Sequence, residues 1–222
     1  MDNIRRELDG IVITAELTMI SITQGVALYF LIESSYEIIV SMHFFLWPYV
    51  VVGLLVIFVF WSRTMIHTLT IIRWPLEFIH NFMYIACTLV EAVMFTQITK
   101  PANWFILGFA NAVMIWVTFL FDLRMIRRIK TETGESTKKE FIELLERDQV
   151  LNAKIILPVM MGFSILIIIV SSQFTDFFIQ SNGHLYFAIM QMLFLSGYTI
   201  YTLRFYKTMT PLILAHRQAA WH

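Results

Sequence analysis

Several polar side chains lie inside long apolar stretches of this chain, and they are the first candidates for chemistry. An ionisable group at the centre of a membrane helix costs about 2.5–3.5 kcal/mol on insertion scales, so each one is a candidate for function. Because a helix rises about 1.5 Å per residue, these side chains are predicted to form two layers. The lower layer, roughly 8 Å above the inner helix ends, comprises Glu16, His80 and Asn81. The upper layer, roughly 20 Å up, comprises Gln24, Glu91, Asn111 and Gln191.

Two interpretations of these layers stay open. Amide side chains often join membrane helices through hydrogen bonds worth about 0.6–2 kcal/mol, and this interpretation is favoured for Gln24, Asn111 and Gln191. Glu91 is the most deeply placed acid and therefore the stronger candidate for a functional role. Glu16 could instead extend its side chain toward the inner interface.

Small residues form a stripe along the first apolar stretch. Thr14, Thr18, Ser21 and Gly25 follow the i, i+4, i+7, i+11 spacing of one helix face. Such a stripe allows close packing of a second helix. It could also line a narrow pore in which hydroxyl groups contact a partly dehydrated ion. The spacing is compatible with both, and packing is the more common use.

The sequence offers no catalytic, metal-ligating or cofactor-binding set. Cys87 is the only cysteine, so neither an internal disulfide nor a cysteine-based metal site can form. His43 and His184 would lie at the outer ends of two helices and could be considered as an axial pair for haem. Lone histidines at interfaces are more often solvated or packed, so no catalytic residue, metal or cofactor is predicted, and the protein is not expected to be an enzyme.

The composition indicates a membrane protein. Apolar residues make up 58% of the 222 residues and charged residues only 14%, whereas soluble domains carry about 25% charged residues. No basic stripe points to nucleic acid. Because a membrane helix needs about 20 apolar residues, we predict an all-α protein with six transmembrane helices. The six windows are Ile11–Ile32, Phe44–Trp61, Leu76–Ile98, Trp104–Phe121, Ala153–Phe174 and His184–Leu203.

The basic residues predict the orientation of these helices. Of the 16 lysines and arginines, all except Lys100 fall on one side of a six-helix arrangement. Cytoplasmic loops carry such an excess, so both termini are predicted to be cytoplasmic. The protein would then lie in the plasma (inner) membrane of a bacterium or archaeon, as a single membrane domain spanning residues 1–222.

The longest polar segment is predicted to be a cytoplasmic loop over residues 124–152. Thr137 and Glu140 have the spacing of a capping box, which predicts that a helix starts at Thr137. Phe141, Leu144 and Leu145 share one face of that helix. We therefore expect a short amphipathic helix that lies against the inner membrane surface, leads into the fifth transmembrane helix and could bind a cytoplasmic protein.

Two stretches of the sequence resemble the endosomal and lysosomal potassium channel family, whose bacterial relatives are six-helix proteins of about this length. In that family the first helix opens with an Arg-x-x-x-Phe-Ser-Asp motif followed by Gly. In this sequence Asp9 and Gly10 match the motif, Glu7 and Leu8 replace its Phe and Ser, and the arginine is displaced. The second stretch runs from Leu46-Trp47-Pro48 through Phe60-Trp61 and His67 to Asn81. Together the two stretches cover about half of the chain, and the matching positions are Asp9, Gly10, Trp61, His67 and Asn81.

The resemblance implies a homo-oligomer in which the first helix lines an ion pathway. Members of the family narrow this pathway with large aliphatic residues, but the corresponding position here is Thr14. We therefore predict a cation channel or pore subunit, with potassium as one candidate ion, surrounded by membrane lipid. Two alternatives stay open: a non-conducting subunit that anchors a larger complex, and a small ion- or proton-coupled transporter that uses Glu91 or Glu16.

Overall fold

The structure is a computed structural model of the chain that describes residues 2–71, 78–132 and 136–219, with side chains over 7–71, 78–131 and 140–213. Within these ranges, six helices are long and apolar enough to cross a membrane, which confirms the predicted all-α membrane fold. The helices are α1 (Asp2–Val40), α2 (Trp47–Thr70), α3 (Phe78–Phe95), α4 (Pro101–Glu132), α5 (Ser136–Leu151), α6 (Leu157–Gln173) and α7 (Gly183–Ala219). α5 and α6 form one span, joined by the π-helical turn η2 (Asn152–Ile156).

Several helices are longer than their apolar windows. α1 runs to Val40, so Glu37 lies inside the helix and the turn into α2 is confined to the few residues around Met42. α4 continues to Glu132, well beyond the predicted end at Phe121. Hydropathy marks the part of a helix that suits lipid, whereas backbone hydrogen bonding continues into the polar residues beyond it.

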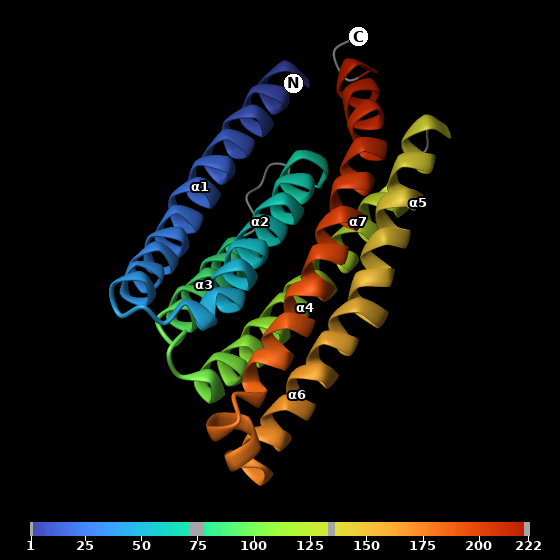
Figure 1. Ribbon diagram of the computed structural model, residues 1–222. Coiled ribbons are helices and arrows are strands. Elements are labelled where there is room, and N and C mark those ends of the chain that lie inside the picture. The colour runs from blue at the N-terminus through green and yellow to red at the C-terminus, as the bar shows by residue number, and fades with distance from the viewer. Residues whose placement is uncertain (1, 72–77, 133–135, 220–222) are drawn as a thin grey trace.

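The helices run alternately up and down the bundle (Figure 1). The N-terminal end of α1, the C-terminal ends of α2, α4 and α7, and all of α5 lie at one end of the molecule. The connections from α1 to α2, α3 to α4 and α6 to α7 lie at the other end. The basic residues near these helix ends therefore gather at the end that holds both termini, as the six-helix arrangement requires.

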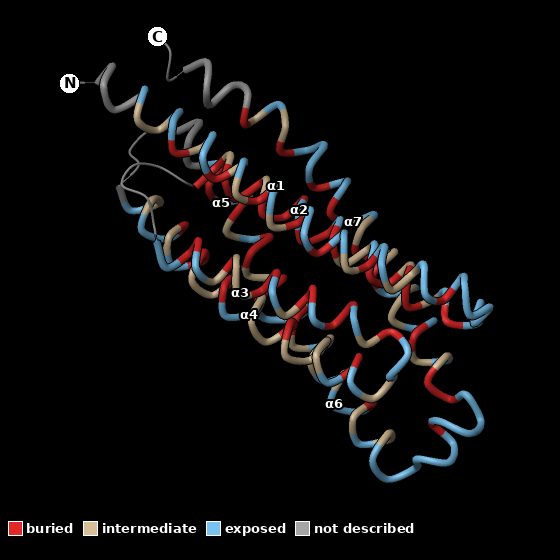
Figure 2. Tube along the Cα trace, turned by 90° about the vertical axis from the view of Figure 1, so that its left-hand side faces the viewer, coloured by how far each residue is buried: buried red, intermediate tan, exposed pale blue. Residues whose placement is uncertain are grey.

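The core lies where helices face each other, and the outward faces are exposed (Figure 2). α1 packs on α2 and α3, α4 packs on α3 and α6, and α7 packs on α2. Gly53 permits the close approach of α1 and α2, because a Cβ there would lie 2.7 Å from a methyl carbon of Leu31. At the end away from the termini, an aromatic cluster joins the helices. Its members include Tyr49, Trp104, Phe105 and Phe178.

The segment before α6 corrects one prediction. A helix was expected to start at Thr137 and lie along the membrane surface, and α5 does begin at Ser136. α5 leads into α6, as expected, but through η2 the two continue as one rod (Figure 1) instead of a helix turned along the surface. The predicted cap by Thr137 lies outside the described side chains. The apolar face of α5 packs inward, because Phe141, Ile142 and Leu145 are buried against residues of α2, α4 and α7.

The cytoplasmic location of both termini stays a prediction of the charge pattern. Reporter fusions after Met42, Lys100 and Asn182 should report the outer face, and fusions at Gly134 and the C-terminus should report the cytoplasm. Alkaline phosphatase activity and fluorescence of a cytoplasmic reporter give independent measurements of each position. The end opposite the termini has a single lysine or arginine, Lys100, and the charge pattern therefore places it outside the cytoplasm. A cytoplasmic signal at Lys100 would contradict the predicted orientation.

Candidate functional site

A buried ion pair and its hydrogen-bond partners join α2, α5, η2 and α7 near the end that holds the termini. Arg63 of α2 contacts the carboxylate of Asp148 of α5 with both of its terminal nitrogens, one of them at 3.3 Å. The hydroxyl of Tyr201 donates to the same carboxylate at 2.6 Å, and the amide of Asn152 donates to it at 3.2 Å. Tyr198 then donates to the Asn152 oxygen at 2.5 Å. Both charges are therefore neutralised inside the protein.

Aromatic rings enclose the arginine of this pair. The guanidinium carbon of Arg63 lies 5.7 Å from the ring centre of Phe119 and 5.4 Å from that of Phe205. Only 1% of the Arg63 side chain is exposed. Cation–π contacts of this kind contribute up to about 2 kcal/mol when water is excluded. They stabilise the position of the guanidinium between α4 and α7.

A second buried cluster contains the residues of the lower polar layer. Asp122 of α4 lies between two histidines: its Oδ2 is 2.7 Å from His67 Nδ1, and its Oδ1 is 3.2 Å from His80 Nε2. Glu16 of α1 faces His80 and Asn81 of α3 from the other side. The structure thus brings Glu16, His80 and Asn81 together, as their depths suggested, and adds two residues from α2 and α4.

The upper polar layer divides into two groups. On one side, the Gln24 amide of α1 donates to Glu91 Oε2 at 3.4 Å and to Thr88 Oγ1 at 3.3 Å. On the other side, Gln191 of α7 accepts a hydrogen bond from the Trp104 indole at 3.3 Å. Equal depth therefore coincides with contact for Gln24 and Glu91, but it does not bring all four residues together.

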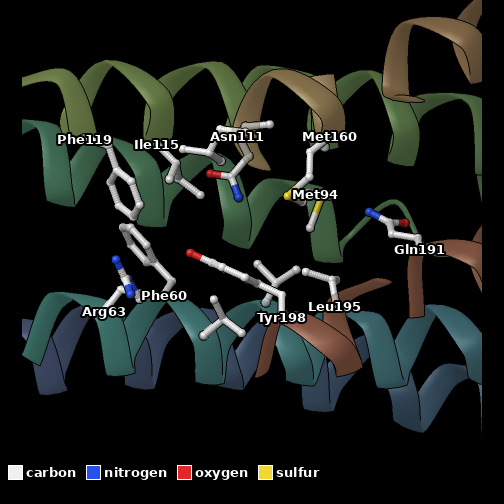
Figure 3. A pocket seen from close by; sticks show the side chains of 15 residues that line it. Phe60, Arg63, Met94, Asn111, Ile115, Phe119, Met160, Gln191, Leu195 and Tyr198 are labelled. Carbon is white, nitrogen blue, oxygen red and sulfur yellow. The ribbon is translucent and has the colours of Figure 1, made fainter. Parts of the chain in front are cut away.

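Asn111 and Gln191 line an internal cavity of about 60 Å³ between α2, α3, α4, α6 and α7. Asn111 and Tyr198 point into this cavity from opposite walls (Figure 3). Arg63 closes one end, and most of the remaining lining is apolar. The volume has room for only a few water molecules. The cavity therefore suits water or a very small polar molecule.

The predicted stripe lies on the outward face of α1. Thr14, Thr18, Ser21 and Gly25 are all exposed, and nothing in the fold lies within 4 Å of a Cβ built on Gly25. The three hydroxyls donate to backbone carbonyls four residues earlier, at 2.9, 2.8 and 2.8 Å. Within the described residues, the stripe thus packs against no other helix.

The residues that match the channel family have different environments. His67 and Asn81 are buried in the cluster around Asp122. Trp61 is 37% exposed on the outer face of α2. Gly10 is exposed and Asp9 half-buried near the start of α1. The two histidines considered as a haem pair have separate contacts. His184 is hydrogen-bonded to the Tyr49 hydroxyl at 2.9 Å, whereas His43 is exposed beside Ser41.

Sequence reasoning missed three charged residues of the two buried clusters. Arg63, Asp122 and Asp148 lie outside the apolar windows and were not predicted to be buried. One signal was present: Asp148 and Asn152 have the i, i+4 spacing of one helix face, which predicts that both side chains point the same way. No local pattern indicates that Arg63 is the partner.

The fold defines an integral membrane protein of six transmembrane helices, and buried polar clusters join these helices. Comparisons of the chain with models of known protein families, with curated proteins and with solved structures find no match.

The Arg63–Asp148 pair yields a stability prediction. Asp148→Asn keeps the shape of the side chain but leaves the arginine charge buried without compensation, so the free energy of unfolding should fall by about 3–5 kcal/mol. Tyr201→Phe removes only one hydrogen bond to the carboxylate and should cost about 1.5–3 kcal/mol. The double variant Arg63→Met/Asp148→Asn should recover part of the loss. Thermal unfolding in detergent measures all three, and equal losses for Asp148→Asn and Tyr201→Phe would contradict the assignment.

Proposed function

We propose that the protein is the subunit of a homo-oligomeric cation channel in which the exposed face of α1 lines the pore. The observation that carries the proposal is the exposed hydroxyl stripe on α1. The proposed location is the plasma membrane of a bacterium or archaeon with both termini in the cytoplasm. Potassium stays a candidate ion from the family resemblance alone.

The hydrogen bonds of the stripe favour cations over anions. A hydroxyl has one hydrogen to donate and two lone pairs to accept with. Thr14, Thr18 and Ser21 already donate that hydrogen to the backbone of α1. Their oxygens therefore offer lone pairs outward and no free donor. Rings of such oxygens around an axis would replace part of the hydration shell of a cation, as pore-lining oxygens do in known channels.

Glu7 extends the polar face of α1 beyond the stripe toward the N-terminus. Glu7 is exposed and lies seven residues before Thr14, which places it on the same face of α1. From Glu7 to Gly25 the helix rises roughly 27 Å, close to the hydrocarbon thickness of about 30 Å. In an oligomer, Glu7 would contribute a ring of acids at the cytoplasmic mouth, and acidic rings attract cations.

The interior of the single chain is a poor route for a cation. The internal cavity is lined by the guanidinium of Arg63, by neutral polar groups and by apolar side chains. Its lining residues come from helices other than α1. Glu16 and Glu91 are buried between α1 and α3, away from this cavity. These observations favour a pathway between subunits over the transporter alternative.

A set of substitutions at Thr18 tests the pore. Thr18→Leu should block cation flux, because a bulky apolar side chain on the axis expels water. Thr18→Val has the shape of threonine without the oxygen and should lower the flux, whereas Thr18→Ser retains the oxygen and should conduct. Ala15→Leu places the same bulk on an exposed position about 60° from Thr18 and about 90° from the centre of the stripe around α1, and it serves as the matched control. The measurement is potassium and sodium flux into liposomes that contain the purified protein.

Each outcome of this set has a distinct meaning. Loss of flux in Thr18→Leu with normal oligomer size supports the pore. Loss of oligomeric order in Thr18→Leu would mean that the stripe packs between subunits, where overfilling costs roughly 1–3 kcal/mol. Absence of flux in the wild-type protein would favour the non-conducting anchor subunit, with the segment 124–152 as the surface for a cytoplasmic partner.

Water accessibility gives a second, independent prediction. Cysteines at positions 14, 18 and 21 should react with small charged thiol reagents in the intact membrane, because a pore holds water along its axis. Cys87 is fully buried and should not react, so the wild-type protein serves as the control for background labelling. A cysteine at Val159, which is 55% exposed on α6, should stay unreactive because it faces lipid. Unreactive thiols at all three stripe positions would contradict the pore assignment. Mass spectrometry of the labelled protein provides the readout.

A further inference from the structure

We propose that α1 and α3 enclose a binding site for a monovalent alkali cation, formed by Glu91, Gln24, Tyr84 and Thr88. This site is separate from the exposed stripe and does not depend on whether the protein conducts. It lies on the inward flank of α1, where Gln24 directly precedes the exposed Gly25. The proposal starts from the charge of Glu91.

Glu91 is a deeply buried acid for which the fold supplies no positive partner. Only 1% of the residue is exposed. Among the residues that the structure describes, the ion pairs involve Asp122, Asp148, Glu143 and Glu146, and none includes Glu91. A carboxylate in such a place is strongly disfavoured unless a cation or a proton neutralises it. Asp148 pairs with an arginine, Asp122 contacts two histidines and Glu16 faces His80. By contrast, within the described residues the Glu91 carboxylate accepts a hydrogen bond only from the neutral amide of Gln24.

The atoms around Glu91 form a set of oxygen ligands. Gln24, Thr88 and Tyr84 are 5%, 3% and 2% exposed, and all carry oxygen on their side chains. Glu91 Oε1, Gln24 Oε1 and the Tyr84 hydroxyl have no hydrogen-bond partner within the described part of the chain. The Tyr84 hydroxyl lies beside Gln24 and Thr88 and within electrostatic reach of Glu91. Glu91 thus lies beside side chains that carry two further buried oxygens with free lone pairs, those of Gln24 and Tyr84.

The Gln24 amide is free to turn its oxygen toward the site. Its two hydrogen bonds, at 3.3 and 3.4 Å, are longer than the usual range of about 2.7–3.2 Å. The oxygen and nitrogen of an amide occupy nearly the same positions, so a half-turn exchanges them. With its oxygen turned inward, Gln24 would join Glu91, Thr88 and Tyr84 as a ligand.

The composition of the site indicates the class of ion. Hard cations prefer carboxylate, amide and hydroxyl oxygens, so an oxygen-only site suits alkali and alkaline-earth ions. A single carboxylate balances one positive charge. No group of three His, Cys, Asp or Glu residues suited to a metal ion occurs in the described ranges. A monovalent ion such as Na⁺ or K⁺ therefore matches the charge of this site, whereas a divalent ion would leave one charge unbalanced in the membrane interior.

Ion binding can be measured by the thermal stability of the purified protein in detergent. Choline chloride is replaced stepwise by NaCl or KCl at constant ionic strength, and Tm is recorded. A ligand that binds only the folded state should raise Tm by about 3–5 °C for each tenfold increase above its dissociation constant. The cation that fits the site better should act at lower concentration. Because no flux is measured, failure of the channel proposal would leave this result unchanged.

Three variants locate the ion. Glu91→Gln removes the charge with little change of shape and should abolish the response of Tm to Na⁺ and K⁺. Tyr84→Phe removes one oxygen ligand and should shift the response to about tenfold higher concentration or more. Glu16→Gln makes the same chemical change at another buried acid between α1 and α3 and should retain the wild-type response.

A wild-type Tm that is the same in choline, sodium and potassium would overturn the proposal and assign a proton to Glu91. A normal ion response in Glu91→Gln would place the bound ion elsewhere in the protein. If Glu91→Gln cannot be purified, Tyr84→Phe decides the question, because an unchanged concentration dependence in that variant would also overturn the site.

Discussion

Arg63 and Asp148 are both buried between helices, so each charge must lie against the other. The arrangement of the bundle depends on this ion pair. Desolvation costs several kcal/mol for each ion, and only good geometry with further hydrogen bonds offsets it. The groups that complete the geometry come from several elements: Asn152 from η2, Tyr198 and Tyr201 from α7, and the ring of Phe119 from α4. These elements must therefore stay in one axial register, because a shift of one turn would separate the charges.

Asp122 imposes the same constraint on the other side of the bundle. Its two histidine partners come from α2 and α3, and Glu16 attaches α1 to this cluster. Buried polar and charged contacts thus join the helices at the end that holds the termini. At the opposite end the helices are joined mainly by rings, such as Tyr49 against Trp104 at 5.2 Å between ring centres. Ring contacts tolerate small shifts better than buried charges do, so the charged end sets the helix register.

The six spans could be predicted because a span is a local property of about 20 residues. The buried clusters could not, because their partners are distant in the chain: Arg63 and Asp148 are 85 residues apart. Hydropathy windows also stop at the first charge, which left Arg63 and Asp148 outside the predicted spans although both residues lie in helices that pack inside the bundle. The spacing of Thr14, Thr18 and Ser21 correctly put them on one face. Only the structure shows that this face points away from the rest of the chain, since a helix pattern does not indicate which neighbour covers it.

α1 presents two polar faces with opposite roles. Toward α3 it directs Glu16 and Gln24, which interact with charged and polar groups of the bundle. Outward it directs hydroxyl oxygens whose hydrogens are bonded to its own backbone. Apolar packing alone would let α1 rotate or slide at little cost in lipid, where water does not drive helices together. The inward polar contacts oppose such motion, because rotation would expose Glu16 and Gln24 to hydrocarbon. The direction of the outward stripe is therefore determined by the residues on the opposite face of the same helix, and an ion bound at Glu91 would strengthen this constraint at the depth of Gly25.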